Sequence, residues 1–240
     1  MSASGWAAEL KAHGTIAPRR SLAEEAADTL REFILLGKLK PGMPVPERDL
    51  AEAMGVSRTP LKEALRILEI EGLIVYSTTR RPRVADPTIE ELTHNLVVLG
   101  GLEALAGELA CIHASDDDIA RAAELESWMA HAPENTAPLE FFRWDMDFHG
   151  TIVRAANNPP LLESHERFNA RLWRARFISS KLRTGRSSTL AQHADIIAAF
   201  KRRDATRMAA VMRHHLETAV TNIRTAQDLL KQQPEHGGLT

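Results

Sequence analysis

The segment from Glu47 to Glu71 constrains the fold most, because its apolar residues have the spacing of two short helices joined by a tight turn. The apolar anchors of the two helices are Leu50, Ala51, Met54, Val56, Ala64, Leu65 and Leu68. Gly55 permits the turn between them, and Ser57 is a suitable N-cap for the second helix. Pro60 is tolerated in the first helical turn. The segment therefore predicts a helix-turn-helix.

This pattern exposes two cations and two hydroxyls at the start of the second helix. They are Ser57, Arg58, Thr59 and Lys62. A recognition helix directs its N-terminal side chains at bases and phosphates in the major groove, so we predict that these residues contact DNA. The alternative is that they are ordinary solvated residues of a helical hairpin.

Two β-rich runs follow the helix-turn-helix and favour the first of these interpretations. Residues 73–79 and 82–86 flank a turn, which predicts a hairpin with Arg80, Arg81 and Arg83 at its tip. Guanidinium groups there can enter a minor groove or contact phosphates. A further helix is predicted from Ser21, which makes residues 21–86 a winged helix-turn-helix, preceded by a flexible arm over residues 1–20.

The stretch from Gly37 to Ile74 resembles the DNA-binding domain of the GntR family of bacterial regulators. The resemblance implies that operator DNA is contacted by Arg48 and by the four residues at the start of the recognition helix. The chain departs from the family at two positions. Lys62 stands where the family usually has Arg, and the wing has Arg81 followed by Pro82 where a Gly is usual. Lysine lacks the bidentate fork of arginine, which weakens the expected base discrimination.

After Asp86 and Pro87 the periodicity is almost entirely helical. Helices are predicted near residues 88–112, 116–130, 137–156, 159–180, 187–202 and 204–231. We expect residues 87–231 to form an all-α bundle for effector binding and dimerisation, and residues 232–240 to form a tail. The fold class is therefore mainly α, with an N-terminal winged helix-turn-helix and a C-terminal helical bundle.

Four polar residues fall on apolar helix faces in the second half of the chain. They are Asp145, His149, His193 and His215. A carboxylate and imidazoles on such faces are costly to bury unless they are paired, and together they form a suitable ligand set for one metal ion. The alternative is that each is a hydrogen-bonded core residue. Asp147 and His214, by contrast, fall on more polar faces.

The C-terminal half resembles the FCD effector domain of the FadR-type GntR subfamily, through Asp145 to His149, Asn158, residues 192–205 and residues 212–216. The resemblance implies a divalent ion, zinc or nickel, held by the four polar residues above. The family often has Arg four residues before Glu103, where this chain has Leu99. The effector is expected to be a small organic acid.

Candidate partners for the carboxylate of this acid are the metal and three arginines of one predicted helix, Arg171, Arg174 and Arg176. These arginines could equally lie on the surface or at an interface. The alternative therefore stays open for each of them.

Composition is consistent with a DNA-binding protein whose basic surface is local. The net charge is −2, and residues 1–86 carry 13 Lys and Arg against 12 Asp and Glu. The single cysteine, Cys111, fits a reducing compartment and is expected to be a small buried apolar residue. No signal peptide and no run of about 18 apolar residues is apparent, so we expect a cytoplasmic protein that does not interact with membranes.

Together these features predict a transcription regulator, with repression as the expected mode of action. It would bind a palindromic double-stranded operator as a homodimer and respond to a small metabolite. We do not expect an enzyme. Two alternatives stay open: a metal-dependent hydrolase, since an ion with this ligand set can activate water, and a metal-free interaction protein whose polar cluster is structural.

Overall fold

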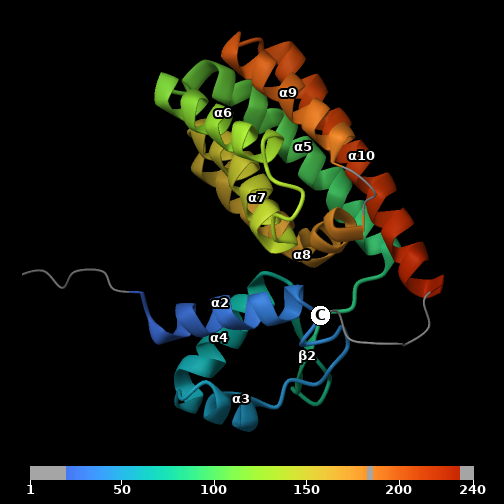
Figure 1. The fold of residues 1–240 in the computed structure, drawn as a ribbon. Helices are drawn as coiled ribbons and strands as arrows, with labels where there is room; N and C mark the ends of the chain where they lie inside the picture. The colour runs from blue at the N-terminus through green and yellow to red at the C-terminus, as the bar shows by residue number, and fades with distance from the viewer. Residues whose placement is uncertain (1–19, 183–185, 233–240) are drawn as a thin grey trace, which may run out of the picture.

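The computed structural model describes residues 20–182 and 186–232, which form two parts joined at the linker around Asp86 (Figure 1). The arm predicted for residues 1–20 and the tail predicted for residues 232–240 lie almost entirely outside the described residues.

The first part is the winged helix-turn-helix that the sequence predicts. Its elements are α2 (Leu22–Leu35), α3 (Glu47–Ala53), α4 (Arg58–Ile70), β1 (Ile74–Tyr76) and β2 (Pro82–Val84). Ser21 and Glu24 form a capping box that starts α2. Gly55 adopts a φ of +65°, a left-handed conformation that residues with a side chain rarely adopt. This conformation allows the tight turn between α3 and α4. Leu61, Leu65 and Leu68 of α4 are fully buried in the core of this part.

The wing is an antiparallel pair of short strands. Ile74 pairs with Val84 and Tyr76 with Pro82, and Pro44 forms an isolated bridge to Arg83. Ile74 and Val84 are buried against the helices, because alternate residues of a strand point to one face. The hairpin turn is thereby held at a fixed place beside α4.

The second part contains six helices among the described residues. They are α5 (Ile89–His113), α6 (Asp116–Ala130), α7 (Pro138–Ala155), α8 (Pro159–Leu182), α9 (Ser187–Lys201) and α10 (Ala205–Gln232). Thr88 with Glu91 and Ser115 with Asp118 form capping boxes at the starts of α5 and α6. Helices α5 and α10 run side by side along the bundle, and α7 and α8 also pack on α5 (Figure 1).

Helix α5 contains an apolar stretch of the length that the sequence was expected to lack. By length and composition it could cross a membrane, although half of its most apolar stretch is buried within the bundle. Core helices of folded proteins pass the same test. The other face of α5 carries the exposed side chains of Val97, Leu105 and Ile112.

The two parts touch where the end of α2 meets α7 and α8. Leu35 is buried with Phe142, Met146 and Phe177, so an apolar contact crosses the junction. Glu32 of α2 also accepts a hydrogen bond from Arg143 of α7 at 2.9 Å. The helical bundle and the winged helix-turn-helix are therefore in direct contact.

We predict that Leu65→Ala lowers the free energy of unfolding of the winged helix-turn-helix by about 2–5 kcal/mol, because it leaves a cavity in a fully buried site. Arg66→Ala, which changes the exposed neighbour, is the matched control and should have little effect. Denaturant unfolding followed by circular dichroism measures both variants. Equal stability of the Leu65 variant and the wild type would show that α4 is not packed as described.

Candidate functional site

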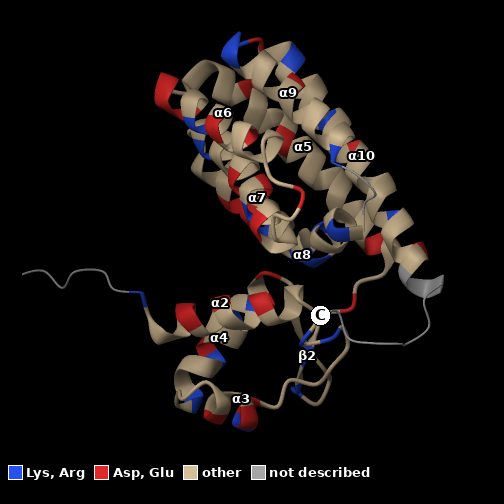
Figure 2. Cartoon of the chain, in the orientation of Figure 1, with Lys and Arg blue, Asp and Glu red and all other residues tan. Residues whose placement is uncertain are grey.

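The residues predicted to contact DNA lie on one end of the winged helix-turn-helix. Ser57 precedes α4, Arg58, Thr59 and Lys62 lie in its first two turns, and Arg48 lies on α3; all five side chains are exposed. Ser57 occupies the N-cap position, but its hydroxyl makes no capping hydrogen bond. Figure 2 shows that this end is mixed in charge, with acidic residues on α3 beside the cations. A basic surface for DNA would have to be local, as the net charge indicates.

The wing differs from the sequence expectation in one respect. Arg80 and Arg81 lie exposed in the turn, but Arg83 lies within β2 and donates a hydrogen bond to the Gly42 carbonyl at 3.2 Å. The prediction that three arginines share the tip was therefore wrong for Arg83, because the second strand begins at Pro82 and includes it.

Arg80 adopts the backbone conformation for which the family usually has a glycine in the wing. This residue adopts a φ of +56°, the left-handed conformation that glycine adopts without strain. For a residue with a side chain, this conformation costs roughly 1–2 kcal/mol. The turn holds it through a hydrogen bond from the Arg80 amide to the Ser77 carbonyl at 2.8 Å. The chain thus has a cationic side chain at the wing tip on a residue whose backbone is strained.

The four polar residues on apolar faces come together in the centre of the helical bundle. Ligand nitrogens of His149 on α7, His193 on α9 and His215 on α10 lie within 4.8 Å of one another. Oδ1 of Asp145 lies 3.2 Å from Nε2 of His193 and 3.8 Å from Nε2 of His149. Three helices therefore contribute to one cluster of possible ligand atoms.

This cluster is buried and its atoms are poorly paired. His149 and His193 are fully buried, and the side chain of Asp145 is 16% exposed. Among the described residues, Nε2 of both histidines and Oδ1 of Asp145 have no hydrogen-bond partner. Leaving such atoms unpaired in a core costs free energy that a metal ion would recover. The donor set of nitrogens and a carboxylate oxygen fits zinc or nickel.

Neighbouring side chains orient two of the imidazoles. Nδ1 of His149 lies 2.9 Å from Oε2 of Glu103, and Nδ1 of His215 donates to Oε1 of Gln192 at 2.9 Å. Gln192 in turn donates to Thr218, which fixes its amide. Because these contacts are made by Nδ1, the Nε2 atoms of His149 and His215 remain available to bind a metal ion. Metal-binding histidines commonly have a carboxylate or carbonyl partner on their other ring nitrogen.

The protonation states also suit a metal site. Burial lowers the pKa of His193 and of His215 below the ordinary value, so both imidazoles are neutral near pH 7. Burial alone would raise the pKa of Asp145 and of Glu103. The effect of burial is outweighed for Asp145 by its contact with His193, and for Glu103 by its contact with His149. The pKa of each carboxyl group therefore lies below its ordinary value. Neutral imidazoles and ionised carboxylates are the forms that bind a metal ion.

Arg176 is the one of the three predicted effector arginines that lies at this cluster. It is 7% exposed, its Nη1 donates to Asn169 at 2.8 Å, and its Nη2 lies 3.9 Å from Oδ2 of Asp145. It lines a cavity of about 40 Å³ together with Asp145 and His215. Arg171 and Arg174 instead line a separate cavity at the junction of the two parts.

Leu99 occupies the position where the family often has Arg, and a different helix brings an arginine near Glu103. Leu99 is fully buried among apolar side chains of α5, α8 and α10. Arg176 of α8 brings a guanidinium to 3.7 Å from Oε1 of Glu103. A cation therefore approaches the Glu103 carboxylate although α5 does not supply it.

Three further residues lie at this site that were not predicted from the sequence: Glu103 and Gln192, which contact the imidazoles of His149 and His215, and the buried His165. Nε2 of His165 lies 3.3 Å from Oε1 of Glu103. Glu103 had a detectable signal, because it is a carboxylate flanked by apolar residues in a helical stretch. His165 lies among polar residues, and the sequence around Gln192 does not indicate which side chain its amide contacts.

We predict that Glu103→Gln weakens zinc binding by about 10–100-fold, because it removes the negative charge that orients and polarises His149. Glu108→Gln changes an exposed carboxylate of the same helix and should leave the affinity unchanged. Competition with a chromophoric chelator measures both dissociation constants. If the two variants bind zinc as tightly as the wild type, Glu103 has no part in the site.

Two family models match the chain in succession. Residues 22–84 match the model of bacterial regulatory proteins of the gntR family, and residues 96–218 match the FCD domain. The first range contains the winged helix-turn-helix, and the second contains all four residues of the buried cluster.

Several relatives are similar to this chain over most of its length. A protein of Streptomyces ambofaciens, described as an uncharacterized HTH-type transcriptional regulator in an unstable DNA locus, is 30% identical over 203 residues, which cover 81% of each chain. The HTH-type transcriptional repressor NanR of Escherichia coli is 26% identical over 83% of each chain. The solved structure of E. coli McbR/YncC, at 23% identity, shares the fold with a TM-score of 0.72 and covers 89% of this chain and 99% of that chain. The chain therefore belongs to the GntR family of bacterial regulatory proteins and has the FadR-type architecture, in which an FCD domain follows the winged helix-turn-helix.

Proposed function

We propose that this regulator binds a palindromic operator as a homodimer and is controlled by a small organic acid that enters the cavity beside the buried Asp and His cluster. The observation that carries the proposal is the set of unpaired buried ligand atoms next to the cavity lined by Arg176. Repression is the proposed mode of action, because a relative similar over most of its length is named a repressor. The proposed location is the cytoplasm, where the DNA is.

DNA binding is proposed for seven exposed side chains of the first part: Arg48, Ser57, Arg58, Thr59, Lys62, Arg80 and Arg81. The recognition helix α4 would lie in the major groove with its N-terminal turn towards the bases. Arg80 and Arg81 would contact the phosphates or the minor groove. The strained φ of Arg80 supports this role, because a conformation that costs stability is expected where function requires it.

The buried cluster is proposed to hold one divalent ion, zinc or nickel, through Asp145, His149, His193 and His215. When bound, the ion would supply a positive charge able to coordinate a carboxylate. Arg176 is held in place by Asn169 and lies at the edge of the same cavity. A carboxylate in the cavity would therefore meet cationic groups on two sides, which supports an organic acid as the effector.

The hydrolase alternative requires a general base beside a metal-bound water. Glu103 is a buried carboxylate near the cluster, but it contacts Nδ1 of His149, away from the Nε2 that faces Asp145. Glu103 does not line the cavity, and its oxygens face His149, His165 and Arg176. This arrangement favours a binding site over a hydrolytic one.

The exposed apolar face of α5 supports a homodimer. Val97 and Ile112 are each 67% exposed and Leu105 is 45% exposed, and the three lie along one side of the helix over about 22 Å. Among the described residues, nothing lies within 4 Å of a Cβ built at Gly101 between them, so a second helix could approach closely. Apolar stripes of this kind mark contact surfaces between proteins. A second copy would also match the two-fold symmetry of a palindromic operator.

Arg58→Ala is expected to weaken binding to the operator by about 1–3 kcal/mol, the cost of one bidentate base contact. The side chain is exposed, so the oligomeric state and the melting temperature should not change. Fluorescence anisotropy at fixed salt measures the affinity, with the operator obtained by selection from random duplexes. Arg121→Ala, on the exposed surface of α6, is the control. An unchanged affinity of the Arg58 variant would remove this residue from the DNA interface.

Val97→Glu is expected to convert the homodimer to a monomer, because it places a charge in the proposed apolar contact. Leu22→Glu changes a similarly exposed apolar residue of α2 and should leave the dimer intact. Sedimentation velocity distinguishes the two states. A Val97 variant that stays dimeric at the same concentration would place the interface on another surface.

A further inference from the structure

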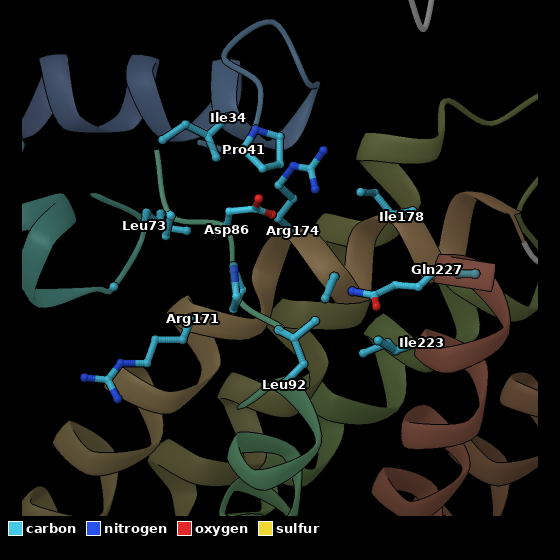
Figure 3. Close-up of a pocket in the computed structure, with 15 residues that line it drawn as sticks. Ile34, Pro41, Leu73, Asp86, Leu92, Arg171, Arg174, Ile178, Ile223 and Gln227 are labelled. Carbon is cyan, nitrogen blue, oxygen red and sulfur yellow. The ribbon is translucent and has the colours of Figure 1, made fainter. Parts of the chain in front are cut away.

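A second cavity lies at the junction between the DNA-binding part and the helical bundle, apart from the histidine cluster (Figure 3). Its volume is about 80 Å³. Leu73 and the linker residue Asp86 line it from the first part, and Leu92, Arg174 and Ile223 line it from the bundle. Anything bound there would contact both parts of the molecule.

The two charged groups that face this cavity, Arg174 and Asp86, do not form an ion pair with each other. Nε of Arg174 is buried and has no hydrogen-bond partner among the described residues. Burial lowers the pKa of Arg174, while the negative charge of Asp86 acts in the opposite direction, so the two groups are close enough to interact. No ion pair joins them in the described part of the chain. A buried guanidinium nitrogen without a partner requires one from elsewhere.

Arg171 contributes to the same cavity with its aliphatic stem. Its guanidinium points away from the cavity and lies 5.8 Å from the Phe168 ring centroid (Figure 3). The stem packs on Gly72, where an added Cβ would lie 2.6 Å from Cγ of Arg171. Among the residues that the structure describes, the charges that face the cavity are therefore one cation, Arg174, and one anion, Asp86, between apolar walls.

The volume of the cavity and the charges that line it indicate which class of ligand fits. A water molecule needs about 10–15 Å³ on this measure, so the cavity holds about five to eight non-hydrogen atoms. The unpaired Nε of Arg174 calls for an anionic group such as a carboxylate, and the carboxylate of Asp86 beside it can accept from an ammonium group. We propose that the cavity is a second ligand site for a small aliphatic α-amino acid, with its carboxylate on Arg174 and its ammonium group on Asp86.

The walls and the entrance agree with this ligand. Leu92, Ile178 and Ile223 offer an apolar surface for a short aliphatic side chain. Asp86 is exposed to solvent, so a solute can enter past the linker. Because the ligand contacts both parts, it stabilises the arrangement in which they close on it and changes the affinity for DNA. This site uses neither the metal nor the organic acid proposed above, although Ile223 lines both cavities.

The test is isothermal titration calorimetry of the full-length protein with L-valine, compared with isovalerate, which lacks only the ammonium group, and isobutylamine, which lacks only the carboxylate. L-Valine is expected to bind, and each single-charge analogue to bind about tenfold more weakly or worse. Arg174→Met and Asp86→Asn should each weaken L-valine binding by about the same factor. Arg171→Met keeps the stem and should bind as the wild type does. Melting curves establish that each variant is folded.

Two outcomes overturn the proposal. One is that L-alanine and L-valine both fail to bind at millimolar concentration, which would mean that the cavity holds only water. The other is that L-valine binds equally well to the Arg174 and Asp86 variants, which would place its site elsewhere. Repeating the titration after chelation separates this site from the histidine cluster, because binding at the junction should persist without metal.

Discussion

The unpaired imidazole and carboxylate atoms in the centre of the helical bundle are the constraint on which the functional account depends. His149 and His193 are fully buried, and their Nε2 atoms meet Oδ1 of Asp145 without forming a hydrogen bond. A core normally pairs its polar atoms or excludes them. Three helices nevertheless bring these groups to one point, and Glu103 and Gln192 orient two of the rings. The arrangement is costly for a protein without a ligand and well suited to one that binds a metal ion.

Sequence reasoning succeeded where local signals decide the structure. Helix α6 was predicted at 116–130 and is found at Asp116–Ala130, because Ser115 and Asp118 supply a capping box. The burial of His193 and His215 follows from their place on apolar helix faces. Periodicity identifies the face of a helix but not its partners across the core. The contacts of Glu103 with His149 and of Arg176 with Asn169 therefore required the structure.

The wing shows a second limit of sequence reasoning. The absence of the usual glycine was visible in the sequence, but the conformation that replaces it was not. A left-handed φ at Arg80 depends on the register of the hairpin, which pairs Tyr76 with Pro82 and leaves residues 77–81 for the turn. The same register placed Arg83 in the strand. Turn geometry follows from strand pairing, and strands of three residues carry too little pattern to define it.

The metal content of protein purified without an affinity tag tests the central claim most directly. Element-resolved mass spectrometry should find one zinc or nickel ion per protomer in the wild type. His215→Ala should lose the ion, whereas His214→Ala, which changes the exposed neighbouring histidine, should retain it. Wild-type protein without stoichiometric metal, or equal retention in the two variants, would show that the buried cluster is not a metal site.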